Sequence, residues 1–194
     1  MNDSSDFEFG SLVFVADDFF ELVNDPFLKT NKGTGHSRPH YFAIQDKFES
    51  DIFWVVPLSS KIQKFDSIVD RKIQANRPHD GLKKVKIRNR ESYLLFQDMF
   101  PTKKEYLTEY KQSGKTVQLK ENNDLNELTK QAYAVVGLLM KGVKFNKTQP
   151  NVKRILEKLS EDNKIHKELS QFVNDNPELK PERAYRSKTN DRGL

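Results

Sequence analysis

The chain has 194 residues and no cysteine, which excludes disulfides and thiolate metal sites. Its length fits one domain with one core, and no stretch approaches the roughly 18 consecutive apolar residues of a membrane span. Charged residues make up 31% of the chain, and the net charge of +5 favours an anionic partner. We expect a cytoplasmic protein without metal or cofactor.

The N-terminal part of the chain predicts a strand, a short helix and a loop. Ser11–Ala16 is a short apolar run rich in residues that favour strands. Asp17 and Asp18 are placed to act as N-cap and first-turn acid of a helix over Phe19–Val23. Residues 29–38 hold two glycines among polar and basic residues, which indicates a mobile basic loop.

Two apolar strands and a helix are expected next. His40–Asp46 and Ile52–Leu58 are apolar at nearly every position, which indicates antiparallel strands that are buried on both faces. From Ser59 to about Ala75 apolar residues recur at helical spacing, and Ser59 or Ser60 is the expected N-cap. The second strand therefore gives way to a helix at a pair of serines.

A basic hairpin is expected after this helix. Val85 and Ile87 alternate with basic residues in a strand that has one cationic face, and Glu91–Gln97 is its expected partner strand. Segment 71–90 contains eight basic residues against one acidic residue. Such a density of positive charge can neutralise phosphates and makes binding depend on salt.

The C-terminal part of the chain predicts helices. Lys103–Gln112 is a polar segment, whereas Asn123–Lys141 has an apolar stripe at helical spacing and is capped by Asp124 or the residue before it. Shorter helices are expected over Asn151–Leu159 and Glu161–Val173. From residue 174 onward the chain is charged and nearly free of large apolar groups.

These elements together predict an α+β fold, with a mostly antiparallel sheet of about five strands and surrounding helices. We expect a flexible N-terminus over residues 1–10, a single domain over residues 11–173, and a charged, flexible tail over residues 174–194. Neither the dinucleotide-binding nor the P-loop glycine motif is present, which argues against enzymes of those classes.

Ser59-Ser60-Lys61 is the polar group at the junction between the second apolar strand and the helix. Backbone amides, two hydroxyls and an ammonium can converge there on one phosphate. Cleavage of RNA needs little more, because RNA supplies its own 2′-hydroxyl as the nucleophile. A serine-rich helix cap with a solvated lysine has the same sequence, so the tripeptide alone leaves both interpretations open.

His40 and Lys64 could complete such a site. His40 opens the first apolar strand and could act as general acid or base, because only imidazole titrates near neutral pH without perturbation. Lys64 lies one helical turn after Ser60 and could add a second positive charge to the site. The alternatives are a surface or capping histidine and a solvated lysine.

Candidate RNA-binding residues lie in the basic loop and the basic hairpin. Tyr93 offers a ring on which a base could stack. The amide of Gln97 and the carboxylate of Asp98 could read a base edge or steady a histidine. The other candidates are Lys29, Lys32, His36, Arg38, Lys83, Lys84, Lys86, Arg88 and Arg90. Basic faces that are merely solvated, and a turn that begins at Asp98, are the alternatives.

Three motifs follow one another along the chain: Pro39-His40-Tyr41-Phe42-Ala43-Ile44, Trp54-Val55-Val56-Pro57-Leu58-Ser59-Ser60-Lys61 and Leu95-Phe96-Gln97-Asp98-Met99-Phe100-Pro101. In this order they resemble the ToxN/AbiQ family of type III toxin–antitoxin toxins, and most of all its CptN-like branch. The resemblance covers residues 11–160. It implies a strongly twisted antiparallel sheet, nearly a small barrel like that of the MazF/Kid toxins, with helices around it.

The resemblance also implies an activity and a partner. The activity is metal-independent cleavage of cellular or phage messenger RNA, which leaves 2′,3′-cyclic phosphate and 5′-hydroxyl ends and can abort phage infection. The partner is a small repeat-derived RNA antitoxin, a pseudoknot, which the toxin cuts into units and then holds in a closed toxin–RNA assembly. Neither a protein antitoxin nor a membrane is expected.

Carried over by position, Ser59 or Ser60 matches the active-site hydroxyl of the family, and Lys61 or Lys64 matches its nearby lysine. His40 stands where ToxN carries a lysine at the start of the equivalent strand. Two other interpretations stay open. One is a non-catalytic RNA-binding module in which the serine pair only binds a phosphate, and the other is a MazF-like ribonuclease neutralised by a protein antitoxin.

Overall fold

The structure is a computed structural model in which residues 8–30, 38–120 and 123–175 are described. Contacts between residues divide the chain into two compact units, Met1–Leu159 and Ser160–Leu194. The predicted flexible ends fall mostly outside the described residues, and so does the middle of the predicted basic loop. The single domain over residues 11–173 therefore stays a prediction.

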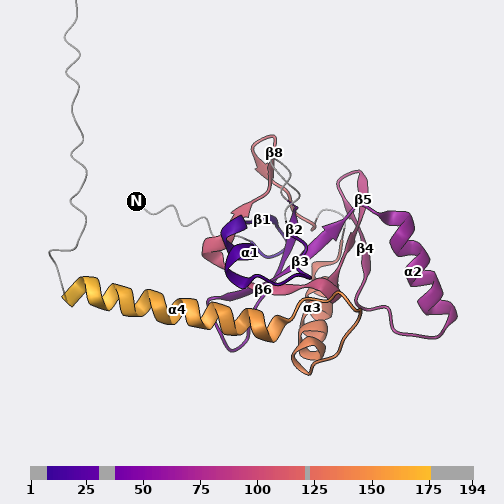
Figure 1. Ribbon diagram of the computed structural model, residues 1–194. Helices are drawn as coiled ribbons and strands as arrows, with labels where there is room; N and C mark the ends of the chain where they lie inside the picture. The colour runs from indigo at the N-terminus through magenta and orange to yellow at the C-terminus, as the bar shows by residue number, and fades with distance from the viewer. Residues whose placement is uncertain (1–7, 31–37, 121–122, 176–194) are drawn as a thin grey trace, which may run out of the picture. The chain divides into compact units, whose positions relative to one another are not determined.

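The first unit is built on a seven-stranded antiparallel sheet (Figure 1). Its strands lie in the order β4-β5-β3-β2-β1-β7, and β6 pairs with β3 outside this path. The antiparallel sheet with helices is confirmed, but the described strands form an open sheet with ends at β4 and β7, not a closed barrel. The strands are β1 (Leu12–Val15), β2 (His40–Gln45), β3 (Ile52–Ser59), β4 (Lys83–Ile87), β5 (Arg90–Leu94), β6 (Phe100–Lys103) and β7 (Leu107–Glu109), with a separate hairpin of β8 (Lys111–Gln112) and β9 (Lys115–Thr116).

Strand β3 lies at the centre of the sheet. One of its edges pairs with β2 from Phe53 to Pro57, and the other pairs first with β6 and then, at its last two residues, with β5. This change of partner falls at Pro57, whose carbonyl accepts a hydrogen bond from the Leu95 amide (3.0 Å) on the same edge. Proline has no N–H, and here that missing donor falls in the gap between β6 and β5.

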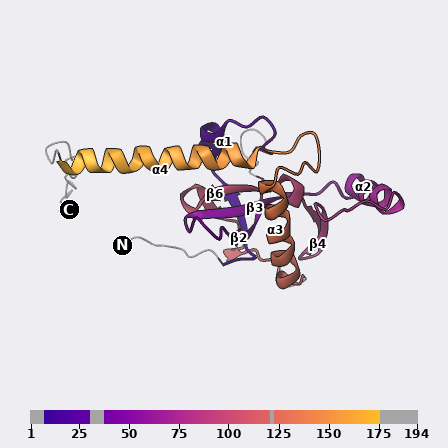
Figure 2. The same cartoon turned by 90° about the horizontal axis from the view of Figure 1, so that it is seen from below.

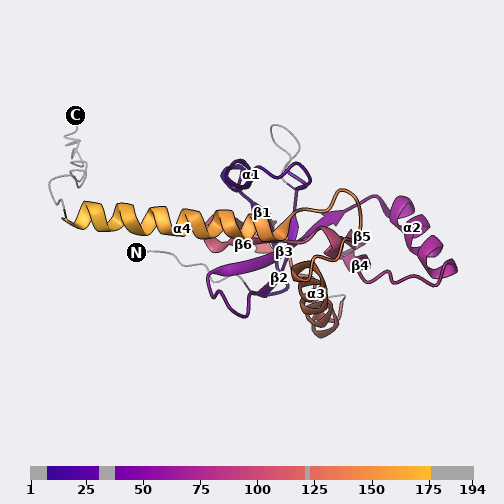
Figure 3. The same cartoon turned by 60° about the horizontal axis from the view of Figure 1, so that its bottom comes forward.

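Apolar side chains cover both faces of the sheet, as the continuous apolar runs predict. Helices α3 (Leu125–Met140) and α1 (Asp17–Val23) pack on opposite faces (Figure 3). Successive β3 residues serve the two sides, since Trp54 belongs to the core under α3 and Val55 to the core under α1. The buried residues of α3 are Leu128, Ala132, Val135 and Leu139, and those of α1 are Phe19, Phe20 and Val23.

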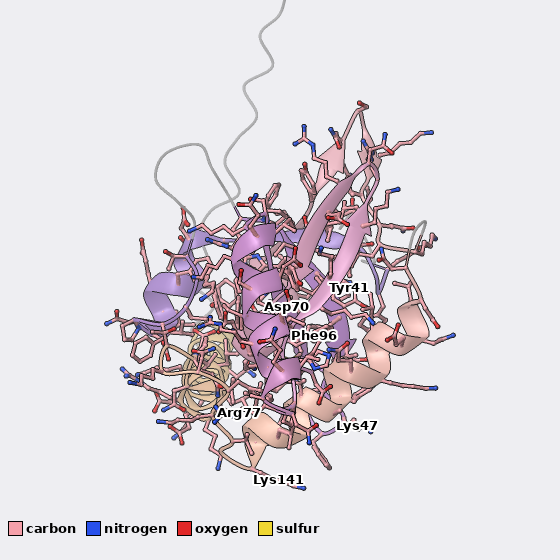
Figure 4. All side chains as sticks on the ribbon, turned by 90° about the vertical axis from the view of Figure 1, so that its right-hand side faces the viewer. Tyr41, Lys47, Asp70, Arg77, Phe96 and Lys141 are labelled. Carbon is pink, nitrogen blue, oxygen red and sulfur yellow. The ribbon has the colours of Figure 1, made fainter. Side chains whose placement is uncertain are left out.

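Helix α2 (Ile62–Gln74) lies against β5 at the end of the sheet (Figures 1 and 2). Phe65 packs on the ring of Tyr93 with 5.4 Å between the ring centroids, and the Tyr93 hydroxyl donates to Asp66 (2.7 Å). Lys84 of β4 makes an ion pair with the same carboxylate (2.9 Å). Figure 4 looks onto this helix, which is otherwise largely exposed. These contacts fix the start of α2 relative to the β4–β5 hairpin.

Two predicted helix starts are wrong, and both errors concern the cap. The N-cap of α1 is Ala16, and Asp17 is the first helical residue. Ser59 pairs with Tyr93 as the last residue of β3, so α2 begins only at Ile62, with Lys61 at the N-cap position. The serine pair therefore belongs to the strand end and the connection. Its hydroxyls are not used as caps of the helix.

The C-terminal helices are predicted more closely. Asp124 caps α3, because its carboxylate accepts from the amides of Asn126 (2.9 Å) and Glu127 (3.3 Å). The two shorter helices predicted after α3 are one continuous helix, α4 (Val152–Asp175), since no glycine or proline interrupts it. Its first eight residues belong to the first unit, and the described part of the second unit continues it.

The outer edge of β4 is covered by a side chain. The Asn123 side-chain nitrogen donates to the carbonyl of Lys86 (2.8 Å), and its oxygen accepts from the amide of the same residue (3.2 Å). An additional strand would make this pair of hydrogen bonds. The side chain of Asn123 thus satisfies the backbone N–H and C=O of Lys86, at an edge of the sheet that has no neighbouring strand.

Candidate functional site

A cleft of about 890 Å³ opens where the end of β3, the start of α2 and the turn of the β4–β5 hairpin come together. Among the described residues, six basic side chains and one acid, Glu91, line it. Leu58 and Phe65 add apolar surface to the same lining. A cationic and partly apolar lining suits a ligand that carries both phosphates and flat apolar rings. The basic residues are Lys29, Arg38, Lys61, Lys64, Arg88 and Arg90.

The junction of β3 and α2 supplies the polar centre of the cleft. Ser59, Ser60, Lys61 and Lys64 all line it, so the structure brings together four of the five predicted catalytic residues. The Ser59 Oγ accepts a hydrogen bond from the Lys61 amide (3.3 Å). Ser60 is exposed, and its hydroxyl has no hydrogen-bond partner within the described part of the chain. The first turn of α2 adds partial positive charge beside these hydroxyls.

Lys29 and Arg38 reach the cleft from other parts of the chain. The Arg38 Nη1 donates to the Leu58 carbonyl (3.1 Å), which places the guanidinium beside the end of β3. The Lys29 Nζ lies 3.0 Å from an oxygen of Asp98, whose side chain is only 3% exposed. Burial lowers the pKa of Arg38, and the charge of Asp98 opposes this shift. One buried carboxylate therefore pairs with Lys29 and interacts electrostatically with Arg38.

The hairpin turn brings two further cations to the cleft. Residues 88 and 89 form a two-residue turn, since Ile87 pairs with Arg90. Arg88 has a φ of 52°, in the left-handed region that non-glycine residues adopt uncommonly. Its Nη1 donates to the side chain of Gln112 (2.7 Å), which ties the turn to β8. Tyr110 also lines the cleft and is partly exposed.

Three predicted cations of the hairpin do not line the cleft. Lys83 makes an ion pair with Glu127 of α3 (2.5 Å), and Lys84 pairs with Asp66 of α2. Lys86 is exposed on β4, outside the cleft. The basic residues of the hairpin therefore do not form one continuous cationic face. Those at its turn line the cleft, whereas Lys83 and Lys84 at its other end make ion pairs with helices.

Tyr93 and Gln97 also lie outside the cleft lining. The ring of Tyr93 is buried between β5 and α2 with 4% exposure, so the predicted stacking on a base is wrong for this residue. Gln97 is half-buried, and its backbone amide donates to the Gly81 carbonyl (2.9 Å). Lys32 and His36 lie outside the described residues.

His40 lies in the core of the sheet. It pairs with Val13 of β1 and Pro57 of β3, it is 0% exposed, and its ring lies 5.4 Å from that of Phe100. Neither ring nitrogen has a hydrogen-bond partner among the described side chains and backbone groups. Burial and then the charge of Arg38 lower the pKa of His40 to about 3, although the Arg38 backbone opposes this shift. The ring is therefore neutral at pH 7.

The sequence did not indicate two residues of the cleft lining, Tyr110 and Gln112, because they lie in a polar segment whose short strands leave no periodic signal. Asp98 was expected to read a base edge or steady a histidine, and nothing in the sequence pairs it with Lys29. Among the described residues, no group of three histidine, aspartate or glutamate side chains could hold a metal ion. No helix in the described ranges is both long and apolar enough to cross a membrane.

Comparison with known proteins finds a likeness among solved structures. No protein-family model matches the sequence, and no curated protein matches it significantly. One solved structure, described as "New insights into the mechanism of bacterial Type III toxin-antitoxin systems: selective toxin inhibition by a non-coding RNA pseudoknot", is similar over 79% of this chain and 97% of that chain, with a TM-score of 0.57 and 17% sequence identity. At this identity the likeness establishes a shared fold.

Proposed function

We propose that this chain is the toxin of a type III toxin–antitoxin system and acts as a metal-independent endoribonuclease. The observation that carries the proposal is the convergence of two serine hydroxyls, six cations and a helix N-terminus in one cleft. The shared fold supports it, because that similar structure concerns a type III toxin inhibited by an RNA pseudoknot. The ordered motifs of the sequence support it independently, and they favour the ToxN/AbiQ family and its CptN-like branch.

In the proposed reaction the RNA substrate supplies the nucleophile. Its 2′-oxygen forms a bond to phosphorus and the bond from phosphorus to the 5′-oxygen breaks, which leaves a 2′,3′-cyclic phosphate and a 5′-hydroxyl. One proton leaves the 2′-hydroxyl and one is delivered to the 5′-oxygen. Ser60, assisted by Ser59, orients the phosphate, while Lys61 and Arg38 stabilise the negative charge that grows in the transition state.

The two proton transfers are assigned to groups that reach the substrate. Lys61 and Lys64 line the cleft and can contact the reacting oxygens. His40, the other candidate, is outside the lining and fully buried, so it would need an intervening group to act. We therefore rank the two lysines ahead of the histidine.

The rest of the cleft is proposed to bind RNA on either side of the cleaved bond. Arg88 and Arg90 would contact these flanking phosphates, Lys29 would contact the phosphate that is cleaved, and Tyr110 would offer the stacking ring that the sequence predicts at Tyr93. The same surface would hold the repeat-derived RNA antitoxin in a closed assembly, and messenger RNA of the cell or of a phage would be the other substrate. We also propose that the open sheet is similar in fold to the sheet of the MazF/Kid toxins.

Cleavage of a defined single-stranded RNA by the purified protein in excess EDTA tests the proposal. We expect products with cyclic phosphate and 5′-hydroxyl ends, found by mapping both ends of each fragment. RNA that is bound but stays intact would support the non-catalytic binding module instead. Loss of toxicity on co-expression of a small acidic protein, and not of a repeat RNA, would favour a MazF-like toxin.

Salt dependence tests which part of the hairpin contacts RNA. Arg90→Gln is expected to reduce the slope of log K against log salt by about 0.7, the value for one phosphate contact with a single strand. Lys83→Gln removes the same charge from the ion pair with Glu127, outside the cleft, and is expected to change the slope far less. Filter binding at four salt concentrations would measure both. Equal slopes for the two variants would contradict the division of the hairpin.

A further inference from the structure

Asp98 is a buried carboxylate that the reaction proposed above does not use. It ends the short 3₁₀ helix η1 (Phe96–Asp98), it is 2% exposed, and it does not line the cleft. One of its oxygens lies 3.0 Å from the Lys29 Nζ, and the other accepts a hydrogen bond from the Asn146 side chain (3.1 Å). Three segments that are distant in sequence therefore meet at this carboxylate.

We propose that Asp98 is a positioning residue: from outside the cleft lining, its carboxylate holds Lys29 in place for the phosphate of the substrate, and its charge offsets the cost of burying that of Arg38. The proposal rests on the ribonuclease function proposed above and names a residue that this function requires. Asp98 itself would not touch the RNA.

The cations explain why a buried acid is needed. Arg38 is half-buried, and its guanidinium is already bound to the Leu58 carbonyl, next to Ser59. Placing positive charge in such a partly desolvated wall is unfavourable, and a nearby negative charge offsets that cost. Lys29 has a flexible side chain, and the ion pair with Asp98 restricts it to one position at the cleft. A fixed charge stabilises a transition state better than one that must reorganise first.

Asn146 completes the arrangement from the other side. Its side-chain nitrogen donates to the Asp98 oxygen that Lys29 does not contact. This bond fixes the rotation of the carboxylate, so the second oxygen faces the lysine. A carboxylate with both oxygens engaged is typical of a group that orients its neighbours.

Asp98→Asn tests the proposal, because it keeps the shape of the side chain and removes its charge. We expect kcat for RNA cleavage to fall by about ten- to a hundredfold, as when an outer carboxylate that orients a functional group is lost. KM should stay within about twofold, since the variant gains net positive charge and loses no RNA contact. Thermal unfolding would confirm that the variant is folded at the assay temperature.

A double-mutant cycle separates positioning from a merely structural role. If Asp98 acts through Lys29, Asp98→Asn should reduce kcat much less in a Lys29→Met background than in the wild type. Asp46→Asn is the matched control, because Asp46 also accepts a side-chain N–H, that of Trp54 (2.8 Å), and lies outside the cleft. We expect it to leave kcat unchanged.

Each outcome decides. An active wild type with unchanged kcat in Asp98→Asn, or equal effects of this change in both backgrounds, would overturn the positioning role and leave the ribonuclease intact. A wild type that cleaves no RNA would overturn both proposals. Should Asp98→Asn fail to fold, Asn146→Ala provides the second test, since it removes one bond to the carboxylate and should lower kcat with KM unchanged.

Discussion

Ser60→Ala is expected to slow RNA cleavage by about 10²–10³-fold, the loss typical of removing one group that binds transition-state charge. The hydroxyl of Ser60 is exposed at the cleft and has no hydrogen-bond partner within the described residues, so it is available to the substrate. Ser59 differs, because its oxygen already accepts from the Lys61 amide. RNA binding should change by only a few-fold, since the cations of the cleft remain.

Ser67→Ala is the matched control for this change. Ser67 lies within α2, it is exposed, and its hydroxyl donates to the Gln63 carbonyl (2.9 Å) outside the cleft. Single-turnover cleavage under EDTA measures both variants. If Ser60→Ala cut RNA as fast as Ser67→Ala, the Ser60 hydroxyl would have no part in the chemistry, and Ser59, Lys61 and Arg38 would have to account for it.

The buried imidazole of His40 is expected to make the fold less stable in acid. The pKa of His40 is lowered to about 3 in the folded chain, whereas an unfolded histidine titrates near its ordinary value of 6.5. Between these values the unfolded chain binds a proton that the folded chain does not. Above pH 6.5 the buried imidazole therefore does not lower the free energy of unfolding. As the pH falls from 6.5 toward 3, protonation of His40 in the unfolded chain lowers that free energy progressively. From pH 7 to pH 5 the expected loss of unfolding free energy is about 2 kcal/mol.

His40→Leu should remove this dependence. Denaturant unfolding at pH 7 and pH 5 gives the loss of unfolding free energy for the wild type and for the variant. The difference between these two losses is the contribution of His40. His79 is exposed, so His79→Leu is the control that removes a histidine and keeps the buried imidazole of His40. Cleavage at pH 7 by His40→Leu tests the proton-transfer role that the sequence predicts for this residue, because retention within about tenfold would fit a core residue. Complete loss in a folded variant would restore His40 as a proton-transfer group.

The elements that the sequence predicts best are those with a clear pattern of their own. β2 and β3 are apolar at nearly every position, and a strand of this kind buries both faces only when it lies inside a sheet that is covered on both sides. The stripe of α3 and the cap at Asp124 are local signals that survive in the structure. β7 was missed because three residues cannot show a period. Pairing with β1 makes it a strand, and that pairing is invisible in the sequence.

The candidate site was predicted unevenly for the same reason. Ser59, Ser60 and Lys61 are consecutive in the sequence, so they lie together at the strand end in any fold of the remaining chain. The partners of Lys83 and Asp98, by contrast, lie 44 and 69 residues away in the chain. His40 looks like a strand entrance in sequence, yet β1 and β3 flank it on both sides, so the first residue of its strand is already interior.

The amide of Asn123 on the outer edge of β4 has a consequence for partners. A protein that recognises a sheet by adding a strand needs a row of free backbone groups, and this edge is already occupied at Lys86. Strand addition there would first have to break two hydrogen bonds and displace the residue that precedes the cap of α3. The same two hydrogen bonds make pairing of this edge with a second copy of the hairpin less favourable at Lys86.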